Sequence, residues 1–387
     1  MSVTFITRRH RAGRYVQQPA GYKAFIPAPL PPNPGIDMDV EMQGLLSNAD
    51  RALGRLDGSI QTLPNPDLFA FMYVRKEAVL SSQIEGTQAS LNDVIRAEAD
   101  IFDPTRPSDV SEVINYIAAM NVGLDELKNL PLSRRLVEQI HERLLRGVRG
   151  NKMNPGEFRR SQNWIGPQGC TPIDAIYIPP PYQVAEETFS DLERFLHGDD
   201  HIPPLIRIGL AHAQFETIHP FLDGNGRIGR LLITFFLCAQ AILQRPVLYL
   251  SLYLKEHREE YYSRLQNVRD RGEWEEWLKF FLRGVNEVAN QATETAKKIV
   301  ALRENHRHLI VERFGNHGGK AVRLLERLYE RPTVSVKDVA SLLEISFPNA
   351  NALVAKFVQH EILRETTGYS RNRIFMYAPY VNLFSNI

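Results

Sequence analysis

Amphipathic helical periodicity runs through most of residues 110–281, and no other feature constrains the fold of this chain as strongly. Two loops interrupt the pattern, a long one at residues 150–181 and a tight one at residues 219–227. In the longer loop, residues 176–178 read Ile-Tyr-Ile beside prolines, which predicts one short hairpin rather than a sheet. With 387 residues, 43% of them hydrophobic, the chain can bury a sizeable core. We therefore expect a mainly α protein.

The segments before residue 110 are predicted to differ in kind. Residues 1–36 carry few helical signals, and the proline-rich run FIPAPLPPNPGI predicts an extended surface segment. Helical patterns then cover residues 38–53, 67–85 and 91–101. Gly86 follows the second of these helices at the position where glycine commonly ends a helix.

The segment from residue 320 onward changes character. Three short helical patterns are followed by two strand-like runs around Gly368, which is the arrangement of a winged helix. This tail has nine Lys and Arg against six Asp and Glu, an excess of three. The recognition helix is expected to expose three polar residues, Asn349, Asn351 and Lys356, of which only the lysine is a cation. Since neutralised phosphates carry most of the affinity for DNA, docking to protein or dimerisation is nearly as well supported as DNA binding.

Whole-chain charge and composition narrow the class of protein. Lys and Arg number 46 and Asp and Glu 45, so a basic footprint for nucleic acid must be local. The longest apolar run, residues 231–243, is too short to span a membrane, and no membrane partner is expected. Cys170 and Cys238 are the two cysteines, a low usage that suits a reducing, cytoplasmic location.

The tight loop and the helix that follows it predict an anion site. Residues 224–226 read Gly-Asn-Gly and open an apolar helix, so backbone N–H groups and the positive helix end face the same place. Arg227 and Arg230 share one face of the first turns of that helix. Two cations at a positive helix end cost free energy unless an anion lies there, and guanidinium groups match phosphate oxygens. The pattern therefore favours polyphosphate.

Two neighbours of this loop carry chemistry of their own. Asp223 could hold Mg²⁺, which binds through one or two carboxylates together with phosphates. His219 is the nearby group able to take a proton near neutral pH. His212 lies seven residues before His219 with no third ligand, so we expect a packed histidine there. The G-x-G-x-x-G spacing of residues 224–229 does not predict a dinucleotide site, because a helix rather than a strand precedes it.

At this point the sequence resembles a known family. Residues 219–230, His-Pro-Phe-Leu-Asp-Gly-Asn-Gly-Arg-Ile-Gly-Arg, match the signature of the Fic (filamentation induced by cAMP) family at every defined position. The resemblance implies a helical Fic core with a short β-hairpin flap and a C-terminal winged-helix domain. It divides the chain into an N-terminal region with an inhibitory helix (residues 1–109), the catalytic core (residues 110–300) and a linker helix with the winged-helix domain (residues 301–387).

Family members usually transfer AMP from ATP to a Ser, Thr or Tyr hydroxyl of a protein, and the resemblance implies the same activity here. By resemblance His219 is the general base, Phe221 packs inward to hold the loop, and Asp223 binds Mg²⁺. Gly226 favours AMP transfer, because a relative that acts as a kinase has a basic residue at that position. The resemblance places the following residues beside the nucleotide: Glu85, His219, Gly224, Asn225, Gly226, Arg227, Ile228, Gly229, Arg230, Tyr261 and Tyr262.

The resemblance also implies autoinhibition. Ser81-x-x-x-Glu85-Gly86 matches the family's inhibitory motif, in which Glu85 pairs with Arg230 and displaces the γ-phosphate. Residues 170–181 resemble the flap, whose strand edge can pair with a target backbone. The implied partners are ATP, Mg²⁺ and an unknown protein target, with self-modification and a homodimer also expected. The alternative is a DNA-binding regulator whose Fic core senses nucleotide.

Overall fold

The computed structural model describes residues 10–61, 66–99, 107–167, 169–198, 201–369 and 371–385 of the chain. Helices dominate it, as the sequence predicts, and the strands are short. Within those ranges no helix is both long and apolar enough to cross a membrane.

The first half of the chain supplies one wall of the core and the helices that lead to the tight loop. Its helices are α2 (Val40–Gln61), α3 (Pro66–Ile84), α4 (Leu91–Glu98), α5 (Val110–Glu126), α6 (Arg134–Leu145), α7 (Tyr182–His197) and α8 (Pro204–Ile218). The predicted helices at residues 38–53, 67–85 and 91–101 correspond to the first three of these.

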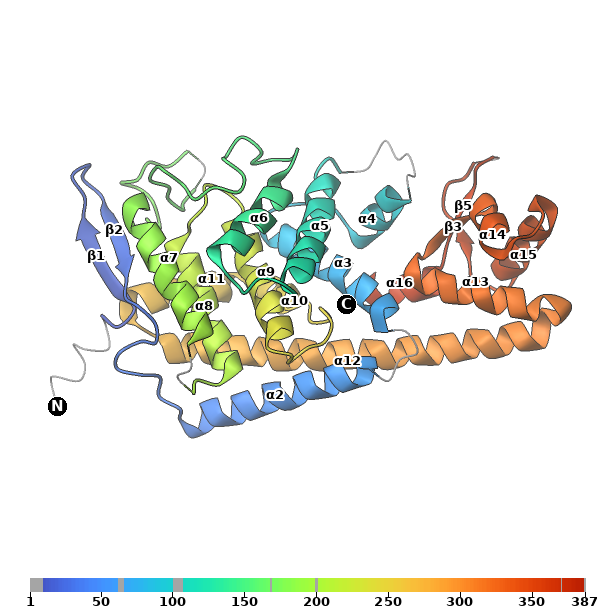
Figure 1. Ribbon diagram of the computed structural model, residues 1–387, viewed down its shortest axis with the longest axis horizontal. Coiled ribbons are helices and arrows are strands. Elements are labelled where there is room, and N and C mark those ends of the chain that lie inside the picture. The colour runs from blue at the N-terminus through green and yellow to red at the C-terminus, as the bar shows by residue number, and fades with distance from the viewer. Residues whose placement is uncertain are drawn as a thin grey trace.

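The second half begins with α9 (Asn225–Ala239), α10 (Ser251–Glu256) and α11 (Arg258–Arg271), followed by the 40-residue helix α12 (Trp274–Arg313). In Figure 1, α12 runs along the base of the molecule, with α2 lying beside it. The two helices pack through small and aliphatic residues, which on α2 include Ala49, Ala52, Leu53 and Leu56. Because α12 continues through residue 300, it belongs both to the core and to the approach to the tail.

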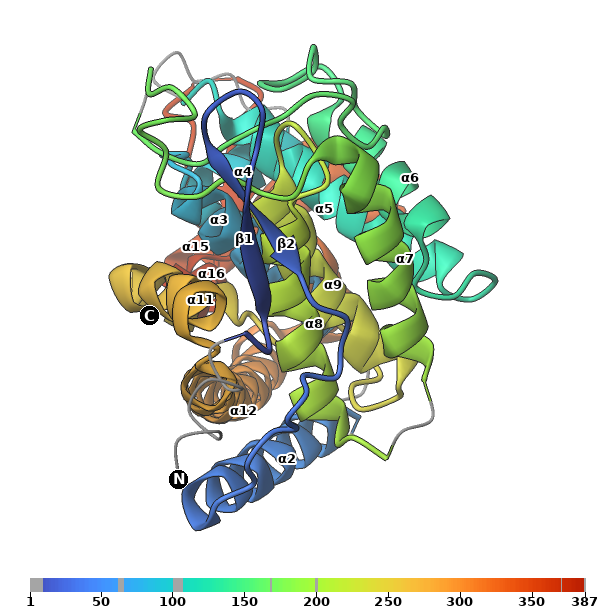
Figure 2. The same ribbon diagram turned by 90° about the vertical axis from the view of Figure 1, so that its left-hand side faces the viewer.

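The N-terminal segment contains a strand pair that the sequence did not predict, while residues 28–36 of the proline-rich run form neither helix nor strand, which agrees with the extended segment expected there. It folds back as an antiparallel pair, β1 (Gly13–Gln17) with β2 (Lys23–Pro27), and Figure 2 shows this pair in front of α8. The Phe25 ring is buried, and its backbone N–H donates to the carbonyl of Ile178 at 2.9 Å. The hairpin therefore extends the flap. Strand pairing inside the described part of the flap loop is a single antiparallel bridge between Ile165 and Tyr177, so the short hairpin expected there reaches back beyond residue 170 and has little regular pairing.

The tail contains the three helices and the strand pair that the sequence predicts. They are α13 (Gly318–Glu330), α14 (Val336–Leu343) and α15 (Phe347–Gln359), with a three-stranded sheet in the order β3 (Thr333–Ser335), β5 (Ile374–Met376), β4 (Arg364–Glu365), after a 3₁₀ turn at Gly315–His317.

A final helix, α16 (Ala378–Ser385), turns back to the core and packs on α3. There the buried Lys76 ammonium donates to the carbonyl of Phe384 at 3.0 Å, and the Phe384 ring meets Tyr73 edge-on with centroids 5.2 Å apart. The helix that carries the predicted inhibitory motif is thus in direct contact with the end of the tail.

Candidate functional site

The tight loop connects the C-terminal end of α8 to the N-terminal end of α9 and is held from the inside. The Asn225 amide is buried and bonds both backbone groups of Phe221, accepting from its N–H at 2.9 Å and donating to its carbonyl at 2.8 Å. Phe221 is fully buried, which matches the inward packing expected of it. Because the Asn225 side chain is used in this way, any contact from residues 224–226 to a phosphate would come from the backbone.

His141 of α6 was not singled out from the sequence, yet it fixes the same loop. Its ring stacks on Phe221 with centroids 3.7 Å apart. Its Nδ1 accepts from the Gly156 N–H at 2.9 Å, so Nε2 carries the proton and donates to the Asp223 carbonyl at 3.0 Å. Burial lowers the pKa of His141 to about 4, which keeps the ring in this neutral form. A lone histidine on an amphipathic helix gives no sequence signal for such a role.

His219 stands where α8 ends, in a left-handed conformation with φ 47° and ψ 60°. Its Nδ1 is buried and has no hydrogen-bond partner among the residues that the structure describes. Burial, followed by the nearby Arg159 and Arg269 cations, lowers the pKa of His219 to about 3. The imidazole is therefore neutral at neutral pH, which is the form that a general base needs, while the lowered pKa makes it a weaker base than a free imidazole.

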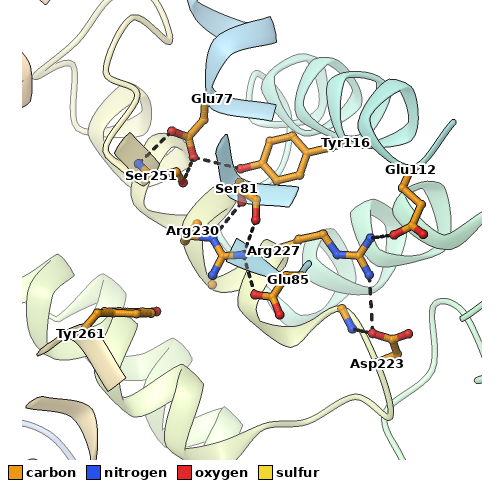
Figure 3. Close-up of polar contacts among 12 residues, drawn as sticks. Glu77, Ser81, Glu85, Glu112, Tyr116, Asp223, Arg227, Arg230, Ser251 and Tyr261 are labelled. Atoms are coloured by element: carbon orange, nitrogen blue, oxygen red, sulfur yellow. Dashed lines mark hydrogen bonds and ion pairs between the residues drawn. The ribbon is translucent and has the colours of Figure 1, made fainter. Parts of the chain in front are cut away.

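Arg230 and Glu85 meet at the first turns of α9 (Figure 3). The Glu85 Oε1 atom lies 2.7 Å from an Arg230 terminal nitrogen, and Arg230 also donates to the Ser81 hydroxyl at 2.8 Å and carbonyl at 3.0 Å. Burial alone would raise the pKa of Glu85, but the Arg230 charge and hydrogen bond lower it below its ordinary value. Gly86 follows with φ 97°, a conformation that suits glycine.

Gly226 makes this contact possible. A β-carbon at residue 226 would lie 2.3 Å from Glu85 Oε1 and 3.0 Å from an Arg230 nitrogen. The space beside Gly226 is thus where the carboxylate rests, against the N-terminal turn of α9, whose first N–H groups have no carbonyl partner within the helix.

Arg227 points elsewhere. Its guanidinium is 1% exposed and pairs with Glu112 of α5 at 3.2 Å and with Asp223 at 3.5 Å. Glu112, which the sequence did not indicate, also lies 3.4 Å from Arg149. A contact from Arg227 to polyphosphate, which the sequence favours, would require this pairing to change, whereas Arg230 already faces a cavity.

That cavity has a volume of about 540 Å³ and brings together six of the eleven residues expected beside the nucleotide. The other five do not line it: Gly224, Asn225, Arg227, Ile228 and Gly229. Its wall includes Glu85, Glu216, His219, Gly226, Arg230, Tyr261 and Tyr262, with Ile165 and Tyr177 from the flap. The Tyr261 hydroxyl is buried against His212, whose other ring nitrogen contacts the Gly229 carbonyl at 3.0 Å, so His212 is packed as expected. Tyr262 is 42% exposed at the rim. A larger hollow beside α3 and α5 holds none of these residues, and its lining cations Arg245 and Arg75 are paired with carboxylates.

Comparisons with known proteins agree with this geometry. Residues 43–125 match the model of the Fic/DOC family N-terminal region, and residues 131–237 match that of the Fic/DOC family. A probable protein adenylyltransferase of Aquifex aeolicus is 26% identical over 202 residues, which is 51% of this chain and 55% of that protein. The protein adenylyltransferase Fic of Culex quinquefasciatus is 30% identical over 175 residues, 44% of this chain and 31% of its own length. The chain therefore spans less than two thirds of either relative.

Solved structures show the same fold. A Fic family protein from Desulfovibrio desulfuricans aligns over 88% of this chain and 97% of its own, with a TM-score of 0.58 and 19% identity. A Fic domain containing signaling protein from Bacteroides thetaiotaomicron aligns over 65% of this chain and 96% of its own, with a TM-score of 0.52 and 17% identity.

Proposed function

The chain belongs to the Fic family, and on that premise we propose that it is a protein adenylyltransferase, which moves AMP from ATP to a Ser, Thr or Tyr hydroxyl of a protein. The observation that supports this most directly is the ion pair of Glu85 and Arg230 beside Gly226. A carboxylate occupies the place where the helix end, the glycine and the guanidinium would receive a phosphate.

In the proposed reaction the target hydroxyl oxygen attacks the α-phosphorus of ATP. The bond from that phosphorus to the β-phosphate oxygen breaks, pyrophosphate leaves, and His219 takes the hydroxyl proton. The backbone of residues 224–226 would face the α- and β-phosphates, and Arg230 would hold the γ-phosphate. Tyr261 and Tyr262, on the opposite side of the cavity, would face the nucleoside.

Mg²⁺ fits the proposal with one protein ligand. Within the described part of the chain no three His, Cys, Asp or Glu side chains are grouped as a metal site. Asp223 is a third exposed and keeps one carboxylate oxygen outside its contact with the Gly224 N–H, and Mg²⁺ commonly binds through one carboxylate together with phosphates. When bound, the ion would offset the negative charge of the polyphosphate.

Autoinhibition belongs to the same proposal. Glu85 and the γ-phosphate would compete for Arg230, because both are anions and Glu85 already takes one of its terminal nitrogens. With Glu85 in place ATP would bind without its γ-phosphate clamp. The target backbone would pair along the flap near Ile165, which places its hydroxyl toward His219.

Further features stay with the proposal. We assign the tail as a winged-helix module, for which docking to protein or dimerisation is nearly as well supported as DNA binding; a gel shift would test the DNA alternative. A cytoplasmic location is supported by the two cysteines, both of them free thiols. A homodimer is expected and is measurable by light scattering on the purified chain.

The experiment that tests the function replaces Glu85 with glycine. Glu85→Gly should raise label transfer from α-labelled ATP to protein by about 5- to 150-fold, the range typical of two ligands coupled through one site. Label from γ-labelled ATP should not appear on protein. Glu273→Gly, which removes a loop glutamate paired with Arg271, serves as the matched control and should leave transfer unchanged. Transfer of γ-label would mean a kinase and would overturn the proposal.

A further inference from the structure

The last turn of α8, which ends at His219, is capped by side chains from outside the helix. The final carbonyls of a helix have no partner within it. Here the Glu216 carbonyl accepts from Arg269 at 3.3 Å, and the Thr217 carbonyl accepts from the Tyr177 hydroxyl at 2.5 Å. The next two carbonyls, of Ile218 and His219, accept from Arg159 at 3.4 and 3.0 Å.

Arg159 is an unusual residue to find in this place. Arg159 is 2% exposed, and across the described ranges no carboxylate lies within ion-pair distance of its guanidinium. Its remaining donors reach carbonyls next to the flap, those of Ser161 at 3.2 Å and Pro180 at 2.5 Å. Its own N–H donates to the Pro220 carbonyl at 2.9 Å. One side chain thus connects both ends of the flap loop to the backbone on either side of the histidine.

Among the described residues, the Arg159 guanidinium is met by carbonyl dipoles and by no carboxylate. A buried cation without a counter-ion costs free energy, and the negative end of a helix dipole offsets part of that cost. Arg269 is likewise a buried cation that binds a carbonyl of this helix end. It is 7% exposed, and its guanidinium lies 3.8 Å from the centre of the Tyr177 ring. Capping the last carbonyls of α8 does not require two cations, because neutral hydrogen-bond donors could serve the same carbonyls.

We propose that Arg159 is a positioning residue for the transfer reaction: it holds the His219 backbone in its left-handed turn and links this geometry to the flap. The inference rests on the proposed function, in which His219 is the general base. Arg159 does not line the nucleotide cavity, so its effect is exerted through His219 and not through ATP.

The other charged and titratable groups around His219 also define its protonation. They come from α3, α8, α9, α11 and the flap: Glu85, Glu216, Arg230, Arg258, Tyr261, Tyr262, Arg269 and Tyr177. The Glu85 charge raises the pKa of His219, as does the backbone carbonyl of Glu216, while Arg159 and Arg269 lower it. In a Glu85→Gly chain the two arginines therefore act without the opposing Glu85 charge, which makes it the suitable parent for the test.

The test compares Arg159→Met with Arg159→Lys in the Glu85→Gly parent. For Arg159→Met we expect kcat for α-label transfer to fall about 100-fold, the size typical of a reactive group displaced by about 1 Å, with KM for ATP unchanged. The acid limb of its pH–rate profile should move to higher pH, because His219 loses a neighbouring cation. Arg159→Lys keeps the charge but not the fork of donors, so its kcat should fall while its acid limb stays in place.

A measurement without turnover separates the two proposals. ¹⁵N-histidine NMR titration, with His219→Ala to assign the signal, should show a higher pKa for His219 in Arg159→Met than in the parent and in Arg159→Lys. If the Glu85→Gly parent transfers no label, the proposed function fails, while the titration still decides the present inference. If the parent is active and Arg159→Met keeps its kcat and its acid limb, the inference is overturned.

Folding is controlled within the same pair of variants. If Arg159→Met does not fold by circular dichroism, Arg159→Lys decides the matter. A reduced kcat with an unshifted acid limb supports the proposal, and the parent's kcat contradicts it.

Discussion

Two helix ends meet at the site, and they hold their arginines in opposite ways. At the C-terminal end of α8, Arg159 and Arg269 bind carbonyl oxygens and no carboxylate within the described ranges. At the N-terminal end of α9, Arg227 and Arg230 are each paired with carboxylates from other helices (Figure 3). The difference follows from the helix dipole, which favours a cation at a C-terminal end and disfavours one at an N-terminal end.

This comparison indicates which contacts can be exchanged. The carbonyl groups of α8 belong to the backbone and cannot be replaced by a ligand, so we expect Arg159 and Arg269 to keep these contacts. Carboxylates at α9 can be replaced by other anions, and the two differ in access: the Glu112 side chain is 7% exposed and the Glu85 side chain 30%. We therefore expect the Glu112 pair to be structural and the Glu85 pair to be the one that yields to ATP.

The largest effect should come from removing the residue at which α8 ends. His219→Ala in the Glu85→Gly parent should lower α-label transfer by about 10²- to 10⁴-fold, the usual cost of a lost general base. ATP binding, measured by calorimetry, should be retained, because the phosphate contacts lie on α9. Transfer at the parent's rate would show that another group takes the proton.

The next test compares the two carboxylates at the α9 end. Glu112→Ala should lower the free energy of unfolding by about 3 to 5 kcal/mol, since it leaves the buried Arg227 with one distant partner. Glu85→Ala should lower it by less than Glu112→Ala does, because the Glu85 side chain is 30% exposed and Arg230 keeps its two hydrogen bonds to Ser81. Urea unfolding of both variants gives these values, and equal losses would contradict the distinction between the pairs.

The smallest effect concerns Glu216, which lies between the two ends with its Oε1 against Gly229 and without a hydrogen-bond partner among the described residues. Burial raises the pKa of Glu216 from its ordinary value near 4.5 to about 7. A carboxyl with a raised folded-state pKa stabilises the fold below its ordinary pKa, and that contribution is lost as pH rises through about 7. Glu216→Gln should therefore unfold with a weaker decline in stability between pH 5 and pH 8 than the unchanged chain.

Much of this site could be predicted from the sequence, because its residues are concentrated in two short motifs. The motif around the glycine loop fixes the order and spacing of His219, Gly226 and Arg230 within residues 219–230. Glu85 lies far away in the chain, and its contact with Arg230 was expected only from the family resemblance. The structure brings the two within 2.7 Å.

Other parts could not be predicted because they depend on where helices end in space. Arg159, His141 and Glu112 belong to no pattern, since each acts through backbone groups or a side chain that is distant in sequence. The N-terminal hairpin was missed because its prolines mask a strand pair of five residues on each side. The sequence does not show which side chain will reach the last carbonyls of a helix, as Arg159 does at the end of α8.

The absence of a side chain at Gly226 bears on which substitutions could change the regulation of such a protein. A β-carbon at residue 226 would contact the ends of both the Glu85 and the Arg230 side chains, so a substitution there would disturb the inhibitory pair and the expected phosphate contact together. A substitution of Glu85 changes the pair alone. Under the proposed function, the resting activity could therefore be adjusted at Glu85 without changing the phosphate contact, but not at residue 226.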